Sequence, residues 1–286
     1  MSSIMSARIE GNRTSIVDAV EGATRSIGGD CTPSEGVQEI INLQDAAAFV
    51  DRVVKPGTPI THALVRELHK IAVSGLNREG DKTPGSYRTG EVMIGGSAHV
   101  PSPPVSVQGD MTELLDFVNR PVEQNFDLLK VAITHHRFVW IHPFGNGNGN
   151  GNGRVCRLFT YAIILSQGFS DSGMYRAVNP TSVFGSDRSR YYSMLEEADS
   201  LTPDGIIRWC EYLLNGMLND MQKLNKLSDS TFVLDGLLRP AIKRVVDAGA
   251  FSARESAALD VVARLTEVKA ADLEIALPGS FSSRSQ

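Results

Sequence analysis

The chain has 286 residues and a formal net charge of −5 at pH 7. This length allows one large domain or two, and the slight acidity gives no support for general binding to nucleic acid or to a membrane surface. The cysteines, Cys31, Cys156 and Cys210, are too few and too scattered for a disulfide framework or a metal cluster. Neither a signal peptide nor a membrane-spanning run is recognisable, so a cytoplasmic location is expected.

Apolar side chains recur at helical spacing along most of the chain. This spacing predicts helices over residues 36–55, 60–75, 111–120, 128–141, 153–167, 189–198 and 205–224. Residues 86–105 instead hold short β-like runs and prolines, which indicate a hairpin and loop rather than a helix. His135 and His136 lie on the helix predicted over 128–141, where a structural role is expected. The predicted fold class is therefore all-α, with a small β-hairpin.

The segment between the two central predicted helices contains most of the chemistry. It reads His142-Pro143-Phe144, then Gly and Asn alternating from Gly145 to Gly153, then Arg154-Val155-Cys156-Arg157. Glycines let successive backbone N–H groups converge on an anion, and a helix that begins near Arg154 adds its free N–H groups. The two arginines lie three residues apart and share one face of the first turn. His142 can take a proton at neutral pH, so the segment suits phosphate chemistry; the alternative is a low-complexity loop beside a buried histidine.

These residues resemble the Fic family signature, His-Pro-Phe-x-(Asp/Glu)-Gly-Asn-Gly-Arg-x-x-Arg. The resemblance extends from about Ser6 to Leu227, and it implies the Fic fold, a helical bundle with a β-hairpin flap. Most Fic proteins transfer AMP from ATP to a protein hydroxyl, with the signature histidine, here His142, as the general base. The resemblance assigns ATP or phosphate binding to Gly151, Asn152, Gly153, Arg154, Arg157, Tyr192 and Asp199, and docking of the target to Ile94, Gly95 and Gly96 in the flap.

The signature loop is longer than the family's. Nine residues, Gly145 to Gly153, separate Phe144 from Arg154, where the family has five. In one register Asn150 to Arg154 is the working loop; in the other Asn146 to Gly149 is the loop and Asn150 replaces the arginine. The first register keeps both arginines and is preferred. In it Asn150 stands where the family has a carboxylate that helps to hold Mg²⁺ or Mn²⁺, so weak metal binding is expected.

A second motif lies near the N-terminus. Residues Ser6 to Gly11 match (Ser/Thr)-x-x-x-Glu-(Gly/Asn), the inhibitory motif of Fic proteins whose inhibitory helix is N-terminal. In those proteins the glutamate, here Glu10, pairs with the second arginine of the signature, here Arg157, and misorients ATP. The alternative is an ordinary exposed helix end. A second Glu-Gly pair, Glu21-Gly22, has Val17 at the Ser/Thr position and matches less well.

The C-terminal segment resembles a truncated winged helix. Ser228 to Ser230 reads as a linker, and a capping box is predicted at Ser252–Glu255. The next helix is predicted over 268–277, and a recognition helix would begin at Ser280 to Arg284, just before Gln286. DNA binding is not expected from so short a fragment. The predicted division is an N-terminal segment with the inhibitory helix (1–35), a Fic domain (36–227) and a C-terminal helical segment (228–286).

The function predicted from the resemblance is a protein adenylyltransferase with low basal activity, autoinhibited by Glu10. It would transfer AMP from ATP to a Ser, Thr or Tyr hydroxyl of an unidentified protein, or of itself, and a homodimer is compatible with the sequence. Two alternatives stay open. The long loop and the missing carboxylate are compatible with a catalytically impaired Fic module that binds or regulates, and a Fic enzyme that removes AMP would carry the same signature.

Overall fold

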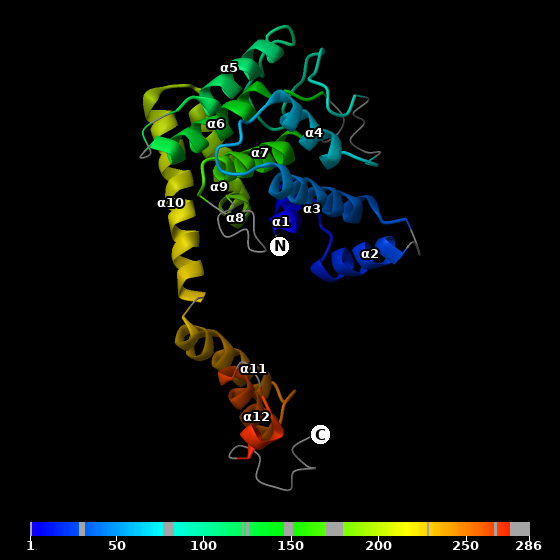
Figure 1. Cartoon of the computed structure of the whole chain (residues 1–286), viewed down its shortest axis with the longest axis vertical. Helices are drawn as coiled ribbons and strands as arrows, with labels where there is room; N and C mark the ends of the chain where they lie inside the picture. Colours follow the sequence, from blue (N-terminus) through cyan, green and yellow to red (C-terminus); the bar gives the residue numbers. More distant parts are fainter. Residues whose placement is uncertain are drawn as a thin grey trace. The chain divides into compact units, whose positions relative to one another are not determined.

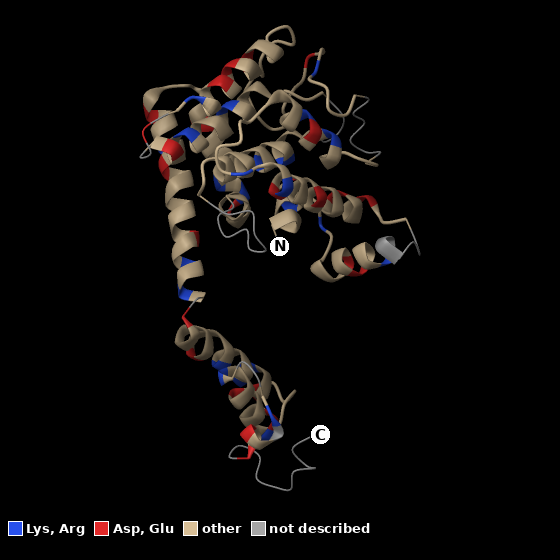
Figure 2. Ribbon diagram, in the orientation of Figure 1, with Lys and Arg blue, Asp and Glu red and all other residues tan. Residues whose placement is uncertain are grey.

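The computed structural model divides the chain into two compact units, residues 1–220 and 221–286. It describes residues 2–28, 32–76, 83–121, 123, 126–145, 151–169, 180–227, 229–265 and 268–274. Acidic and basic residues are interspersed along the helices of both units (Figure 2). None of the helices in the described ranges is long and apolar enough to cross a membrane.

The first unit is built of helices, which confirms the predicted all-α class (Figure 1). They are α1 (Ser2–Ile9), α2 (Ile16–Gly28), α3 (Glu35–Val53), α4 (His62–Ala72), α5 (Val107–Asn119), α6 (Asp127–Ile141), α7 (Asn152–Ser166), α8 (Thr181–Ser186) and α9 (Arg188–Asp199), followed by α10 (Pro203–Leu227), which crosses the boundary between the units. Seven of these helices lie close to the ranges predicted from apolar spacing. Helices α1, α2 and α8 have no counterpart among those ranges, although α1 carries most of the motif assigned to the predicted inhibitory helix.

Helices α6 and α7 pack together at the centre of this unit. Helix α7 is buried from Arg154 to Leu165 and is covered on different sides by α1, α3, α4 and α6. Most of the buried side chains of α7 are apolar, and the exceptions include Arg154 and Arg157. The N-terminal helix α1 packs against α3, α7 and α8, so a segment from the start of the chain lies against the start of α7.

Local backbone chemistry sets the ends of the two central helices. Helix α6 stops at Ile141 because His142 adopts a left-handed conformation (φ 54°, ψ 62°) and precedes a proline. Gly151 (φ 69°) precedes α7 and Gly168 (φ 80°) follows it, both in conformations that glycine adopts without steric cost. The ends of both helices therefore lie where the sequence placed them.

The segment between α4 and α5 is a loop where a hairpin was predicted. In its described part, residues 83–106, the β-type pairing is one isolated antiparallel bridge between Tyr87 and Phe144. The backbone N–H of Arg88 donates to the carbonyl of Pro143 at 2.9 Å. The loop thus pairs with the His-Pro-Phe segment rather than with itself, which replaces the hairpin by a contact with the site.

The second unit has a different character. The helical stretches of this unit after α10 are η2 (a π-helix, Phe232–Leu238), α11 (Arg239–Asp247), α12 (Ala253–Arg264) and η3 (a 3₁₀ helix, Ala270–Leu273). None of the described residues of η2, α11 and α12 is buried. The capping box at Ser252–Glu255 is confirmed, whereas the helix predicted over 268–277 is limited to η3 within the described residues. The predicted linker residue Ser228 and the start of a recognition helix, 280–284, lie outside the described residues.

Candidate active site

Three elements bring the predicted site residues together. His142 lies at the end of α6, Arg154 and Arg157 lie in the first two turns of α7, and Glu10 follows α1. All four belong to the first unit.

The His142 side chain is held in its neutral form. The residue is 8% exposed, and its backbone N–H donates to the carbonyl of Phe138 at 3.0 Å. Burial lowers the pKa of the ring to about 4; the positive charge of Arg88 and the nearby His99 act in the same direction. A hydrogen bond with the backbone of Val139 and the charge of Glu10 oppose this shift. At neutral pH the ring is therefore unprotonated, the form that accepts a proton.

Arg88 holds the backbone beside His142. Its guanidinium donates to the carbonyls of His142 (2.8 Å), Ile141 (3.1 Å) and Gly90 (3.1 Å), and also to that of Ser102. The residue is 4% exposed, and burial lowers its pKa. These contacts were not predicted, because hydrogen bonds to distant carbonyls leave no pattern in the sequence.

The described ends of the signature loop are tied together by Asn152. Its side-chain amide donates to the carbonyl of Phe144 at 3.2 Å and its side-chain oxygen accepts from the N–H of Phe144 at 3.0 Å. Gly153 follows, and a Cβ added there would lie 2.3 Å from a carboxylate oxygen of Glu10. Glycine at 153 therefore lets Glu10 approach the start of α7. Asn150 and the rest of residues 146–150 lie outside the described residues, so the weak metal ligand stays a prediction.

Arg157 is bound by the predicted inhibitory motif. Its Nε donates to Ser6 Oγ at 2.8 Å, and its Nη2 donates to the Ser6 carbonyl at 3.0 Å and to Glu10 Oε1 at 2.8 Å. Burial would raise the pKa of Glu10, but the guanidinium groups of Arg157 and Arg154 outweigh it and hold that pKa below its ordinary value. The buried Nη1 of Arg157 has no hydrogen-bond partner among the described residues. It is an N–H donor that a further anion can engage.

Arg154 is paired with a carboxylate that the sequence analysis missed. Its Nη1 lies 2.8 Å from Glu39 Oε1, and both side chains are largely buried. The other oxygen of Glu39 accepts from Asn12 Nδ2 at 2.7 Å, and Asn12 also donates to the carbonyl of Gly36. Each signature arginine thus carries a carboxylate partner, one after α1 and one on α3. Glu39 stands 115 positions from Arg154 in the sequence, so only the fold shows that the two side chains are partners.

Two further residues predicted to bind ATP, Tyr192 and Asp199, have different surroundings. Tyr192 is 42% exposed, with the guanidinium of Arg188 5.5 Å from the centre of its ring. Burial and the nearby charge of Glu10 raise the pKa of Tyr192. Asp199, in contrast, accepts from His136 Nε2 at 3.0 Å.

The two histidines of α6 make structural contacts. His136 bonds Asp199, and His135 lies between the hydroxyls of Thr160 (2.7 Å) and Tyr191 (3.0 Å). Cys156 is fully buried, and burial raises the pKa of its thiol. These contacts fit the structural role expected of the two histidines.

The segment predicted to dock the target presents an exposed surface. Gly95 and Gly96 are exposed, Ile94 closes a turn with Ser97, and Met93 is 87% exposed. His99 Nε2 contacts the carbonyl of Trp140 at 2.8 Å and so joins this segment to α6.

The second Glu-Gly pair lies elsewhere, on α2, where a Cβ at Gly22 would lie 2.9 Å from Val37 Cγ1. That glycine is therefore explained by helix packing.

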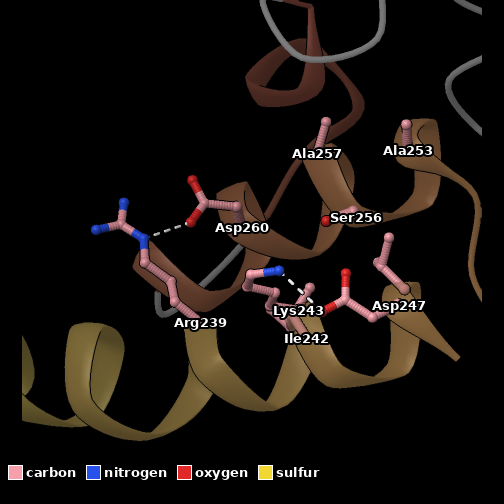
Figure 3. A pocket seen from close by; sticks show the side chains of 9 residues that line it. Arg239, Ile242, Lys243, Asp247, Ala253, Ser256, Ala257 and Asp260 are labelled. Carbon is pink, nitrogen blue, oxygen red and sulfur yellow. Dashed lines mark hydrogen bonds and ion pairs between the residues drawn. The ribbon is translucent and has the colours of Figure 1, made fainter.

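A separate hollow lies in the second unit, between α11 and α12 (Figure 3). Its charged side chains are engaged with one another: Arg239 with Asp260 at 2.7 Å and Lys243 with Asp247 at 2.8 Å. Among the described residues of the whole chain, groups of three or more His, Cys, Asp or Glu side chains suited to a metal ion are absent. The histidine and arginine cluster in the first unit is therefore the better candidate for chemistry.

Comparison with known proteins agrees with this placement. Residues 59–164 match the model of the Fic/DOC family. The chain is 28% identical over 163 residues to the protein adenylyltransferase Fic of Nematostella vectensis (56% of this chain, 34% of that one), and 27% identical over 199 residues to the protein adenylyltransferase fic-1 of Caenorhabditis elegans (67% and 35%). The chain thus spans about a third of the length of these curated relatives.

Solved structures show the same fold. A Fic family protein from Desulfovibrio desulfuricans G20 aligns with a TM-score of 0.57 at 21% identity, over 98% of this chain and 75% of that one. A Fic domain-containing signaling protein from Bacteroides thetaiotaomicron aligns with a TM-score of 0.58 at 20% identity, over 76% of this chain and 81% of that one. At this level of identity the structures establish the fold.

Proposed function

Because residues 59–164 form a domain of the Fic/DOC family, we propose that this protein is a protein adenylyltransferase whose phosphate site is closed by its own N-terminal segment. The observation that carries the proposal is a neutral, buried histidine at the end of α6 together with two arginines in the first two turns of α7, one of them bound by Glu10. The names of the relatives from Nematostella and Caenorhabditis support the same reaction class.

The proton transfer is assigned to His142. The neutral ring takes the proton from a Ser, Thr or Tyr hydroxyl of the target as the oxygen of that hydroxyl attacks the α-phosphorus of ATP. The bond from the α-phosphorus to the bridging oxygen breaks, and pyrophosphate leaves with that electron pair. A positioned general base contributes on the order of 10²–10⁴-fold, and the low pKa of His142 keeps it unprotonated at pH 7.

The phosphate contacts are assigned to the start of α7. The Nη1 group of Arg157 can donate to a phosphate oxygen, and Arg154 lies about one turn before it on α7. The backbone N–H groups of Gly151, Asn152 and Gly153 are further donors at this helix end. Guanidinium groups form the stronger, charge-assisted hydrogen bonds with phosphate oxygens. The Mg²⁺ or Mn²⁺ expected with ATP stays a prediction from the sequence, since Asn150 lies outside the described residues.

The closure is assigned to Glu10. Its carboxylate binds Arg157 as a phosphate oxygen of ATP would, and it lies so near Gly153 that a single added carbon would collide with it. An anion that binds here must therefore displace Glu10 or bind around it. Because Glu10 keeps 32% of its side chain exposed, solvent screens the pair, and its displacement costs less than that of a fully buried pair.

The test compares two labels on ATP in the Glu10→Gly protein. We expect label from α-labelled ATP to enter protein in a His142-dependent manner, while label from γ-labelled ATP stays in pyrophosphate. The reaction is followed by autoradiography after gel separation, with Mg²⁺ or Mn²⁺ present. Transfer of γ-label would indicate phosphorylation instead, and the absence of either label on a protein that binds ATP would support the impaired binding module.

A further inference from the structure

Arg88 is a buried cation whose guanidinium donates hydrogen bonds to backbone carbonyls. Its contacts fall in two groups: Ile141 and His142 at the end of α6, and Gly90 and Ser102 in the loop before α5. Taking a guanidinium out of water is costly unless its donors are satisfied. Here the carbonyls at the C-terminal end of α6 offer the negative end of the helix dipole, which offsets part of that cost.

The two groups of contacts belong to two parts of the proposed site. The first group fixes the backbone of His142, the proposed general base. His142 lies beyond the last residue of α6 and has a left-handed conformation, which is not that of a helix. The second group holds both ends of the segment 90–102, which contains the exposed residues Met93, Gly95 and Gly96. Arg88 also donates its own N–H to Pro143, so its main chain and its side chain act on the same turn.

We propose that Arg88 is a positioning residue that holds the general base and the target-docking loop in a fixed position relative to one another. The proposal rests on the function proposed above. Arg88 acts through His142 and through the loop, and it leaves the arginines that bind phosphate untouched. It therefore controls how the target hydroxyl meets the histidine, while ATP binding depends on the start of α7.

Arg88 also acts on His142 by charge. The charged and titratable groups that face the His142 ring are Arg88, His99 and Glu10, and the backbone of Val139 bonds to it. Arg88 lowers the pKa of the ring and Glu10 raises it. Removing the guanidinium should therefore raise the pKa of His142, whereas a lysine at 88 keeps the charge but cannot serve four carbonyls with a fixed fork of donors.

The experiment uses Arg88→Met and Arg88→Lys in the Glu10→Gly background. A misplacement of about 1 Å at a reacting group costs on the order of 10²-fold in rate, so we expect kcat for AMP transfer to fall by about that factor in both variants. The Kd of ATP, measured by calorimetry, should change by less than about twofold. The acid limb of the pH–rate profile should move to higher pH in Arg88→Met, and in Arg88→Lys it should stay near the pH at which it lies in the parent.

The matched control is Arg66→Met. Arg66 also packs against this loop, with its guanidinium 4.6 Å from the Tyr87 ring and its Nη2 donating to Gln108 at 2.8 Å. Its loss should leave kcat within about twofold of the parent, since it is not a contact of the His142 backbone. A fall in Arg66→Met equal to that in Arg88→Met would overturn the proposal, as would full activity in either Arg88 variant.

A second measurement is independent of the reaction. Titration of His142 by NMR in ¹⁵N-histidine-labelled protein, with His142→Asn to assign its signal, should show a higher pKa in Arg88→Met than in the parent. An unchanged pKa and an unchanged ring environment contradict the proposal even if no AMP transfer is found. Absent transfer in the Glu10→Gly parent would count against the proposed function alone. If Arg88→Met does not fold, Arg88→Lys carries the same kinetic test.

Discussion

The two sides of the candidate site are held in different ways. On the base side, His142 is fixed through its backbone by Phe138 and Arg88, contacts that no ligand could replace. On the phosphate side, Arg157 is held by Ser6 and Glu10, and Arg154 by Glu39. A carboxylate on an arginine occupies the place that a phosphate oxygen can take. The protein itself therefore fixes the position of His142, whereas a phosphate oxygen can compete with the carboxylates for the two arginines.

The strongest test of the base side is the loss of its side chain. We expect His142→Ala in the Glu10→Gly background to lower AMP transfer by on the order of 10²–10⁴-fold. Because His142 has positive φ, alanine adds strain, and His142→Asn is the better-matched variant since asparagine tolerates this conformation. Transfer is measured as initial rate of labelling. A rate within about twofold of the parent in both variants would show that another group is the base.

The strongest test of the phosphate side is the loss of Arg157. In the Glu10→Gly background, Arg157→Ala should lower transfer by on the order of 10²-fold, because one charged donor to the reacting phosphates is removed. It should also weaken ATP binding, which the His142 variants should leave unchanged. Arg190→Ala is the control, since Arg190 lies on α9 with its guanidinium 5.9 Å from the Tyr212 ring. Equal ATP affinity in parent and Arg157→Ala would mean that this arginine does not touch the nucleotide.

The two carboxylates on the phosphate side should differ in stability. Glu39→Gln should lower the free energy of unfolding by about 1–3 kcal/mol, because a largely buried pair with Arg154 is broken. Glu10→Gln should cost less, since the Glu10 side chain is 32% exposed and that of Glu39 is 13% exposed. Urea denaturation of the two variants measures the difference. A larger cost for Glu10→Gln would reverse the assignment of Glu39 as the structural partner.

The smallest expected effect is on pH dependence. Because burial lowers the pKa of His142 from 6.5 to about 4, its ring stays neutral as pH falls through 6.5. An unfolded chain takes up that proton near 6.5, so the histidine makes the fold less stable as pH drops between these two values. In Glu10→Gly the acid limb of transfer should lie near pH 4 or below, since Glu10 raises this pKa. A limb near 6.5 would mean that the ring is solvated.

Sequence predicted those parts of this architecture that depend on local chemistry. The central helices were predicted over 128–141 and 153–167, within one residue of α6 and α7, and the spacing of Arg154 and Arg157 predicted that they share one face. The contact of Arg157 with Glu10 was predicted from the resemblance of residues 6–11 to a family motif, whereas its contact with Ser6 was not.

Contacts between distant segments were not accessible in that way. Glu39 and Arg88 act through partners far along the chain, and neither stands in a pattern that specifies them. The helical stretch 232–247 was missed, and none of its described residues is buried. The hairpin prediction failed for a related reason: strand-like residues at 87 and 88 pair with the His-Pro-Phe segment, and alternation alone does not identify the partner of a strand.

The central claim, that the base side is ready and Glu10 closes the phosphate side, is tested most directly by transfer from α-labelled ATP in Glu10→Gly. The chain supplies its own control in Glu21→Gly, the same substitution at the second Glu-Gly pair, on α2. Coupling between sites is typically worth about 5–150-fold, so we expect Glu10→Gly to raise the initial rate on the order of tenfold over wild type, and Glu21→Gly to leave it unchanged. Equal rates in wild type and Glu10→Gly, with ATP bound by both, would contradict the claim.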